Sequence, residues 1–402
     1  MSSKQKRNSG FSLVELMVAV VIGLLGTLIM FQVFAMSESQ KRTTASGGDA
    51  QQNAATALYT IERELRNAAY GYAPLIQLGR PVYGWDVPNN QIRPARIFRP
   101  VLITPGAGSD TIELSYSNFE GVTHAVPLGS DWNPNGTTMA ISNGSGMKAG
   151  DVLIVCDPNV PEATAPCIQV QITNKTSVDD LVIAPSPATF LRGTETVATV
   201  FNPAGGIRAA LTGNIGARTI PAPYLAGKTT DPHTEVYNIG FVTDTARSYS
   251  VQNGRLMITG DDGVPQEYAD GIVSIRAQYG LDTDLNGSVD KWVNPRGNTG
   301  QAFSSFTPNA LAAEFDISNE TTTAASWARV RAIRVGIVTR SNNIEKTAVE
   351  SRTSIPLWVN PAGPSDAAPS FSLAATDDHR YRYTVFDSII PFRNMIWNPH
   401  RL

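Results

Sequence analysis

The most pronounced pattern in the chain is an apolar run close to its N-terminus. Residues 1–10 are polar and basic, whereas residues 11–36 are almost wholly apolar, with no charge between Glu15 and Glu38. As a helix, this uncharged stretch would be roughly 33 Å long, which is enough to cross the hydrocarbon layer of a bilayer. The pattern therefore predicts a membrane-spanning helix at 11–36. The basic flank favours an N-terminus in the cytoplasm, with the rest of the chain on the other side.

Helical periodicity continues beyond the apolar run. Apolar side chains recur at spacings of four, three, four and three residues, at Ala54, Leu58, Ile61, Leu65 and Ala68. Glu62 and Arg66 are expected to pair one turn apart on the exposed side. Because Gly71 and Pro74 end the pattern, an amphipathic helix is predicted over 37–72, continuous with the apolar half. Together the two halves would form one helix about 90 Å long.

From residue 73 onward the pattern changes to short alternating runs between turns. The 33 glycines and 26 prolines of the chain suit a body with many turns. The strand candidates are 111–116, 151–156, 167–172, 235–242, 255–258, 272–279, 330–340, 352–359 and 381–386. Residues 203–232 and 360–369 are expected to be loops. The fold class is α+β: a long helix packed on one enlarged antiparallel β domain at 73–402, or on two lobes at about 73–230 and 231–402.

Charge and motif content exclude several classes of function. The formal net charge of -3 offers no basic surplus, so no nucleic acid partner is predicted. The four histidines are scattered, and the sequence contains no HExxH, GxSxG or P-loop motif. We therefore predict that the chain is not an enzyme. An exported, membrane-anchored enzyme is the least favoured alternative.

One acidic residue interrupts the apolar run. Glu15 follows Phe11 by four positions, and a carboxylate inside a membrane segment is costly unless a cation compensates it. Cleavage between Gly10 and Phe11 would create such a cation, the new α-amino group, and would make Glu15 the fifth residue of the trimmed chain. We therefore interpret Glu15 as a functional residue.

Residues 4–16, Lys-Gln-Lys-Arg-Asn-Ser-Gly-Phe-Ser-Leu-Val-Glu-Leu, resemble the class III signal of type IV prepilins. The resemblance implies that residues 1–10 are a leader peptide, which a membrane prepilin peptidase removes after Gly10 before Phe11 is methylated. It also implies that Glu15 pairs with the N-terminus of a neighbouring subunit during assembly. The alternatives are an ordinary secretory signal cut before Met36, or an uncleaved membrane anchor.

Four further segments resemble the PilW family of minor pilins: 58–70, 277–282, 328–335 and 392–394. This resemblance implies a minor pilin that helps initiate a type IV pilus and sits at or near its tip. The implied partners are other minor and major pilins, a PilY-type tip adhesin, the prepilin peptidase and an inner-membrane assembly platform. The chain would be a single-pass inner-membrane protein before assembly and part of the extracellular pilus afterwards. A GspJ-like pseudopilin of a type II secretion system and a pilus-borne adhesin remain as alternatives.

A short acidic segment has the spacing of a calcium loop. Oxygen-bearing residues alternate around Gly287, at Asp282, Asp284, Asn286, Ser288 (through its carbonyl) and Asp290. The twelfth position of an EF-hand is Val293 instead of glutamate, so a shorter loop between strands is expected. Structural Ca²⁺ is the one candidate cofactor, and none is required. The alternative is an acidic hairpin turn that holds no ion.

The chain has two cysteines, Cys156 and Cys167, which flank a proline-rich segment. Because the N-terminus implies export to an oxidising compartment, a disulfide between them is predicted. Closing so short a loop would stabilise the fold by about 3 kcal/mol. The alternative is two separate core thiols.

Overall fold

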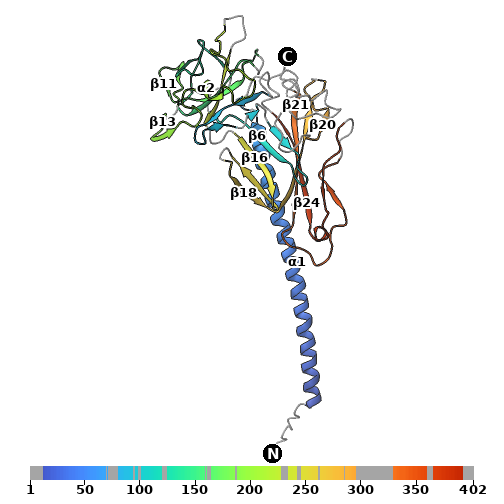
Figure 1. The fold of residues 1–402 in the computed structure, drawn as a ribbon. Coiled ribbons are helices and arrows are strands. Elements are labelled where there is room, and N and C mark those ends of the chain that lie inside the picture. The colour runs from blue at the N-terminus through green and yellow to red at the C-terminus, as the bar shows by residue number, and fades with distance from the viewer. Residues whose placement is uncertain are drawn as a thin grey trace, which may run out of the picture.

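The computed structural model shows a long helix that projects from a β-rich head (Figure 1). It describes residues 12–68, 70, 80–93, 96–97, 101–119, 125–158, 160, 164–185, 188–227, 234–241, 246–260, 263–284, 286–295, 329–359 and 365–392. Helix α1 (Leu13–Asn67) is continuous over 55 residues, and its C-terminal part lies within the head. The predicted α+β arrangement of a long N-terminal helix on an antiparallel β-rich domain is confirmed.

The helix ends earlier than the predicted residue 72. Ala68 leaves the helical conformation, with a backbone ψ of 144°. The carbonyl of Tyr70 then accepts a 2.7 Å hydrogen bond from the N–H of Ser117. The chain therefore turns into the head directly after Asn67, because tertiary hydrogen bonding replaces the last predicted turn of helix.

Two sheets enclose the C-terminal half of α1. One has the order β18-β17-β16-β6-β5 and the other β20-β19-β21-β24. Their strands are β5 (Val101–Thr104), β6 (Thr111–Ser115), β16 (Ala246–Gln252), β17 (Arg255–Thr259), β18 (Pro265–Asp270), β19 (Ile272–Leu281), β20 (Lys291–Val293), β21 (Val330–Arg340) and β24 (Tyr383–Pro391). The largest core packs Ala57, Ile61 and Leu65 of the helix against both sheets. The predicted apolar stripe is thus the buried face of α1.

The head contains a third, six-stranded sheet. Its order is β4-β1-β10-β9-β15-β7. The strands are β1 (Pro81–Tyr83), β4 (Arg96–Ile97), β7 (Val126–Pro127), β9 (Asp151–Cys156), β10 (Cys167–Gln171) and β15 (Glu235–Phe241). The pair β1–β10 is parallel, and every other strand pair among the described residues is antiparallel.

Small elements cover a second core beside this sheet. They are β2 (Trp85–Asp86), β3 (Gln91–Ile92), β8 (Thr138–Ala140), β11 (Asn174–Lys175), β12 (Asp180–Val182), β13 (Thr189–Arg192), β14 (Glu195–Ala198) and helix α2 (Ile207–Leu211). Helix α2 lies inside 203–232, which was expected to be a loop. It forms because Ile207 and Leu211, one turn apart, are both buried in the second core.

The suggested division into lobes near residue 230 does not separate the sheets. Strands β5 and β6 precede that point but join β16–β18, which follow it, and β15 pairs with β9. The boundary was wrong because backbone pairing links segments more than 100 residues apart.

The C-terminal part adds β22 (Ser354–Pro356), β23 (Ser370–Ser372) and the 3-10 helix η5 (Thr376–Arg380). The strand predicted at 352–359 is confined to β22, because Leu357 and Trp358 turn into a small core beneath β21. The predicted strand at 330–340 coincides with β21, and the one at 381–386 is longer in the structure, as β24.

Candidate functional site: the exposed helix and an acidic loop

The N-terminal half of α1 exposes a continuous apolar surface. Leu13 and Phe31, near its two ends, are 75% and 76% exposed, and the large apolar side chains between them are exposed as well. Among the described helices, α1 alone is long and apolar enough to cross a membrane, and none of its most apolar window is buried in the chain. Such a surface needs lipid or other apolar helices to cover it.

Glu15 lies at the start of this exposed half, in the first turn of α1. Its Oε2 accepts a hydrogen bond from the N–H of Ser12 at 3.4 Å, while the Ser12 hydroxyl accepts one from the N–H of Val14 at 3.3 Å. Ser12 and Glu15 thus form a capping box. The sequence analysis missed this role, although the spacing Ser-x-x-Glu carries it. Gly10 and Phe11 lie outside the described residues.

A buried polar cluster joins α1 to the head. The carboxylate of Glu64, which is almost fully buried, accepts hydrogen bonds from the Tyr249 hydroxyl and the Arg247 guanidinium, both on β16. Burial raises the pKa of Tyr249, and the nearby Glu64 carboxylate raises it further, so the hydroxyl remains a donor. The cluster fixes the helix against the five-stranded sheet.

The sequence predicted the position of Glu62 on the exposed side of this helix, but it did not single out Glu64. The predicted Glu62–Arg66 pair is present on the helix surface. Glu64 lies three residues after Ile61 and seven after Ala57, so it is part of the buried stripe. The sequence does carry a signal for Glu64, because an acidic residue within an apolar helical stripe indicates a buried polar contact.

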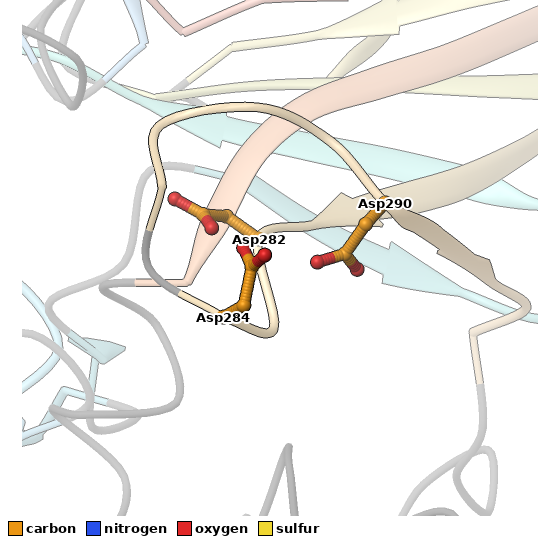
Figure 2. A group of neighbouring side chains, drawn as sticks. All are labelled: Asp282, Asp284 and Asp290. Carbon is orange, nitrogen blue, oxygen red and sulfur yellow. The ribbon is translucent and has the colours of Figure 1, made fainter.

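The acidic segment forms the turn between β19 and β20 (Figure 2). Three of its candidate ligands converge: carboxylate oxygens of Asp282, Asp284 and Asp290 lie within 4.8 Å of one another. Gly287 adopts the left-handed conformation, with φ 92°, as the sharp turn requires. The turn therefore collects oxygen atoms of the kind that Ca²⁺ prefers.

Other contacts also hold these carboxylates. Asp282 is fully buried and accepts hydrogen bonds from Asn286 N–H (2.9 Å), Gly287 N–H (2.9 Å) and Arg331 Nε (3.0 Å). Burial alone would raise the pKa of Asp282, but the Gly287 and Arg331 hydrogen bonds outweigh it and hold the pKa below its usual range. Arg331 thus neutralises part of the charge of the turn.

Asp290 and Asn286 also accept hydrogen bonds from within the turn. Asp290 accepts hydrogen bonds from the N–H and the hydroxyl of Thr283, at 2.9 and 2.8 Å. The Asn286 side-chain oxygen accepts one from the N–H of Ser288 at 2.8 Å. The structure therefore brings Asp282, Asp284 and Asp290 together. Asn286 is bonded to the cluster as a donor, because its side-chain amide donates to Asp284 at 2.8 Å, while its side-chain oxygen is taken by Ser288.

Cys156 and Cys167 are joined in a disulfide, with their Cα atoms 4.4 Å apart. They end β9 and begin β10, which pair as the expected hairpin, and both are fully buried. The bridge closes the proline-rich segment over the main core.

Comparison with protein families gives two matches. The prokaryotic N-terminal methylation motif matches residues 5–31, and the type IV pilus-assembly protein W family, PilW, matches residues 236–394. The C-terminal part of the chain is therefore similar to the PilW family. The match runs from β15 through β24, so it includes the four-stranded sheet beside α1 and the acidic turn. The matched family is one of pilus-assembly proteins, which have a structural role.

Other comparisons add little to this assignment. The type IV-like pilin TTHA1219 from Thermus thermophilus is 11% identical, with a TM-score of 0.16, over 38% of this chain and 68% of that one. No curated protein matches the chain significantly.

Proposed function

We propose that the chain is a minor pilin that helps initiate a type IV pilus and is incorporated at or near its tip. Its partners there would be other minor pilins and a PilY-type tip adhesin, with major pilins forming the shaft below. The observation that carries the proposal is an exposed apolar half-helix bearing a methylation motif and Glu15, joined to a PilW head.

The assembly mechanism follows from that helix. Before assembly, the apolar half crosses the inner membrane and the head lies in the periplasm. Prepilin peptidase cuts after Gly10, and the new Phe11 amine is a cation four residues, or about 6 Å of helix, from Glu15. At the assembly platform the helix leaves the lipid and packs against other apolar helices. The pairing of Glu15 with a neighbour's Phe11 amine then sets the register between subunits.

Two measurements test this function. N-terminal sequencing of the membrane-extracted chain is expected to begin at a methylated Phe11, and immunogold labelling of sheared pili is expected to mark their tips. A mature start at Met36, or an intact Met1, contradicts the pilin assignment. A GspJ-like pseudopilin would give a different result: the immunogold label would be confined to the periplasm, and deletion of the gene would abolish secretion but leave twitching intact. Direct surface binding by the head would identify an adhesin.

We also propose that the turn at Asp282, Asp284 and Asp290 binds a structural Ca²⁺. The support is the convergence of three carboxylates, which repel one another unless cations intervene, and of which Arg331 is seen to contact Asp282. The ion would hold the ends of β19 and β20 together.

Calcium is expected to raise the melting temperature of the chain, and a chelator to reverse the rise. At a free concentration 100 times the dissociation constant, the gain would be about 2.7 kcal/mol. Asp284→Ala should abolish the calcium effect, whereas the control Asp377→Ala, at an exposed acid on η5, should retain it. A melting temperature that is identical in calcium and chelator would mean that the turn holds no ion.

A further inference from the structure

The lowest loop of the head lies beside the helix just above its apolar half. The Ser46 hydroxyl accepts hydrogen bonds from the N–H groups of Asn342 and Asn343, at 2.8 and 3.3 Å. The Asn343 side-chain amide also donates to the carbonyl of Arg42 at 3.4 Å. Residues 341–350, the lower loop, are therefore tied to α1 at Arg42 and Ser46.

This position can be compared with the thickness of a bilayer. Arg42 follows Met36, the last residue of the apolar run, by six residues, which is about 9 Å along a helix axis. The headgroup layer on each side of a bilayer adds roughly 5–8 Å beyond the hydrocarbon. With the apolar half in the membrane, the lower loop lies at the outer boundary of the headgroups. In Figure 1, the lower ends of β24 and its neighbouring loops are the part of the head nearest the exposed helix.

The lower loop presents apolar and cationic side chains at this level. Ile344 and Val349 are 44% and 41% exposed, and Lys346 between them is exposed too. Lys41, five residues before Ser46 on α1, adds a second exposed cation. Apolar side chains beside lysines favour the interface of a membrane that contains anionic lipids.

Four acids around this surface are paired with neighbouring arginines. Their described ion pairs are Glu38–Arg42, Glu345–Arg382, Glu350–Arg352 and Asp377–Arg380. These pairs reduce the repulsion that the acids would exert on lipid phosphates.

The loop backbone is also fixed to η5. The N–H groups of Glu345 and Val349 donate to the carbonyls of Arg380 and His379, each at 2.8 Å. The side chains of Ile344 and Val349 are therefore held on a braced loop, which lowers the entropy cost of docking.

We propose that the lower loop rests on the lipid headgroups of the inner membrane before assembly, with Ile344 and Val349 at the interface and Lys41 and Lys346 near lipid phosphates. The inference rests on the proposed membrane-spanning state. The contact would fix the height and tilt of the head above the membrane, and it would break when the helix moves into a filament.

The test uses the full-length chain in vesicles of mixed zwitterionic and anionic lipid. Because both native cysteines are bonded to each other, single added cysteines can carry a fluorophore. The positions are Ile344→Cys in the lower loop, Val178→Cys as an exposed control on the turn between β11 and β12, and Leu25→Cys in the apolar half. Quenching by nitroxides on lipid headgroups and by iodide in water is measured at each.

The label at 344 should be quenched several-fold more by headgroup nitroxides than the label at 178, and less by iodide. If the labels at 344 and 178 are quenched equally, the lower loop does not contact the headgroups. If acyl-chain nitroxides still quench the label at 25 in that experiment, the membrane-spanning state stands and only the lower-loop contact is overturned. A label at 25 that only iodide quenches overturns the membrane-spanning state itself. If the label at 344 is protected from iodide in sheared pili but not in vesicles, the lower loop contacts a neighbouring subunit in the filament and not the membrane.

A charge reversal provides a second readout. Lys346→Glu lies on the exposed side of the loop and should leave melting unchanged while it reduces headgroup quenching at position 344. The control is Arg63→Glu, which reverses a charge at an exposed position of α1 beside the head, more than four turns of helix above Ser46. Equal quenching in the Lys346→Glu and Arg63→Glu proteins contradicts the proposed role of Lys346.

Discussion

Glu15→Ala should reduce incorporation of the chain into filaments by on the order of 100-fold while the head remains folded. Removing one partner of a buried ion pair costs about 3–5 kcal/mol, because the other charge is left uncompensated. In the proposed filament that other charge is the Phe11 amine of a neighbour. The head should be unaffected, since Glu15 bonds to Ser12 and, within the described part of α1, lies far from the first buried residue, Ser46. Immunoblots of sheared pili, normalised to total protein, measure the effect.

Glu15→Gln separates pairing from helix capping. Glutamine at the third helical position of a capping box still accepts the hydrogen bond from Ser12, but it carries no charge. If charge pairing drives assembly, Glu15→Gln should be nearly as defective as Glu15→Ala. Normal incorporation of the glutamine variant would show that capping is the role of Glu15, and normal incorporation of both would contradict the assembly mechanism.

The helix could be predicted from the sequence because its signals are local. The apolar run, the stripe from Ala54 to Ala68 and the Glu62–Arg66 pair depend only on residues a turn or two apart. The β9–β10 hairpin was predictable for the same reason, since its two strands are separated by one short segment. The processing residues and Glu15 likewise belong to a compact motif.

The sheet arrangement could not be predicted in this way. Strand β1 pairs in parallel with β10, and β6 pairs with β16 from more than 100 residues away. Alternation identifies a strand but does not name its partner. The false boundary near residue 230 and the missed helix α2 both follow from this limit, because each depends on what the segment packs against.

The largest stability effect is expected at Glu64. Glu64→Ala should lower the free energy of unfolding by about 3 kcal/mol, because it leaves the fully buried Tyr249 hydroxyl without its acceptor and Arg247 without its anion. Arg247 retains some access to solvent, which places the loss at the lower end for a buried pair. Thermal or urea unfolding of the detergent-solubilised chain, followed by tyrosine and tryptophan fluorescence, measures the change.

A neighbouring acid on the same helix gives the matched control. Glu62→Ala removes a surface i,i+4 pair with Arg66 and should cost only about 0.5 kcal/mol. Tyr249→Phe combined with Glu64→Ala should cost less than the sum of the two single changes, since both remove the same hydrogen bond. Equal losses for Glu62→Ala and Glu64→Ala, or strict additivity with Tyr249→Phe, would contradict the role of this cluster in holding the helix to the head.

If the cluster does hold them together, then force on the helix during extraction from the membrane is transmitted to β16, and Glu64→Ala should also reduce incorporation despite an intact Glu15.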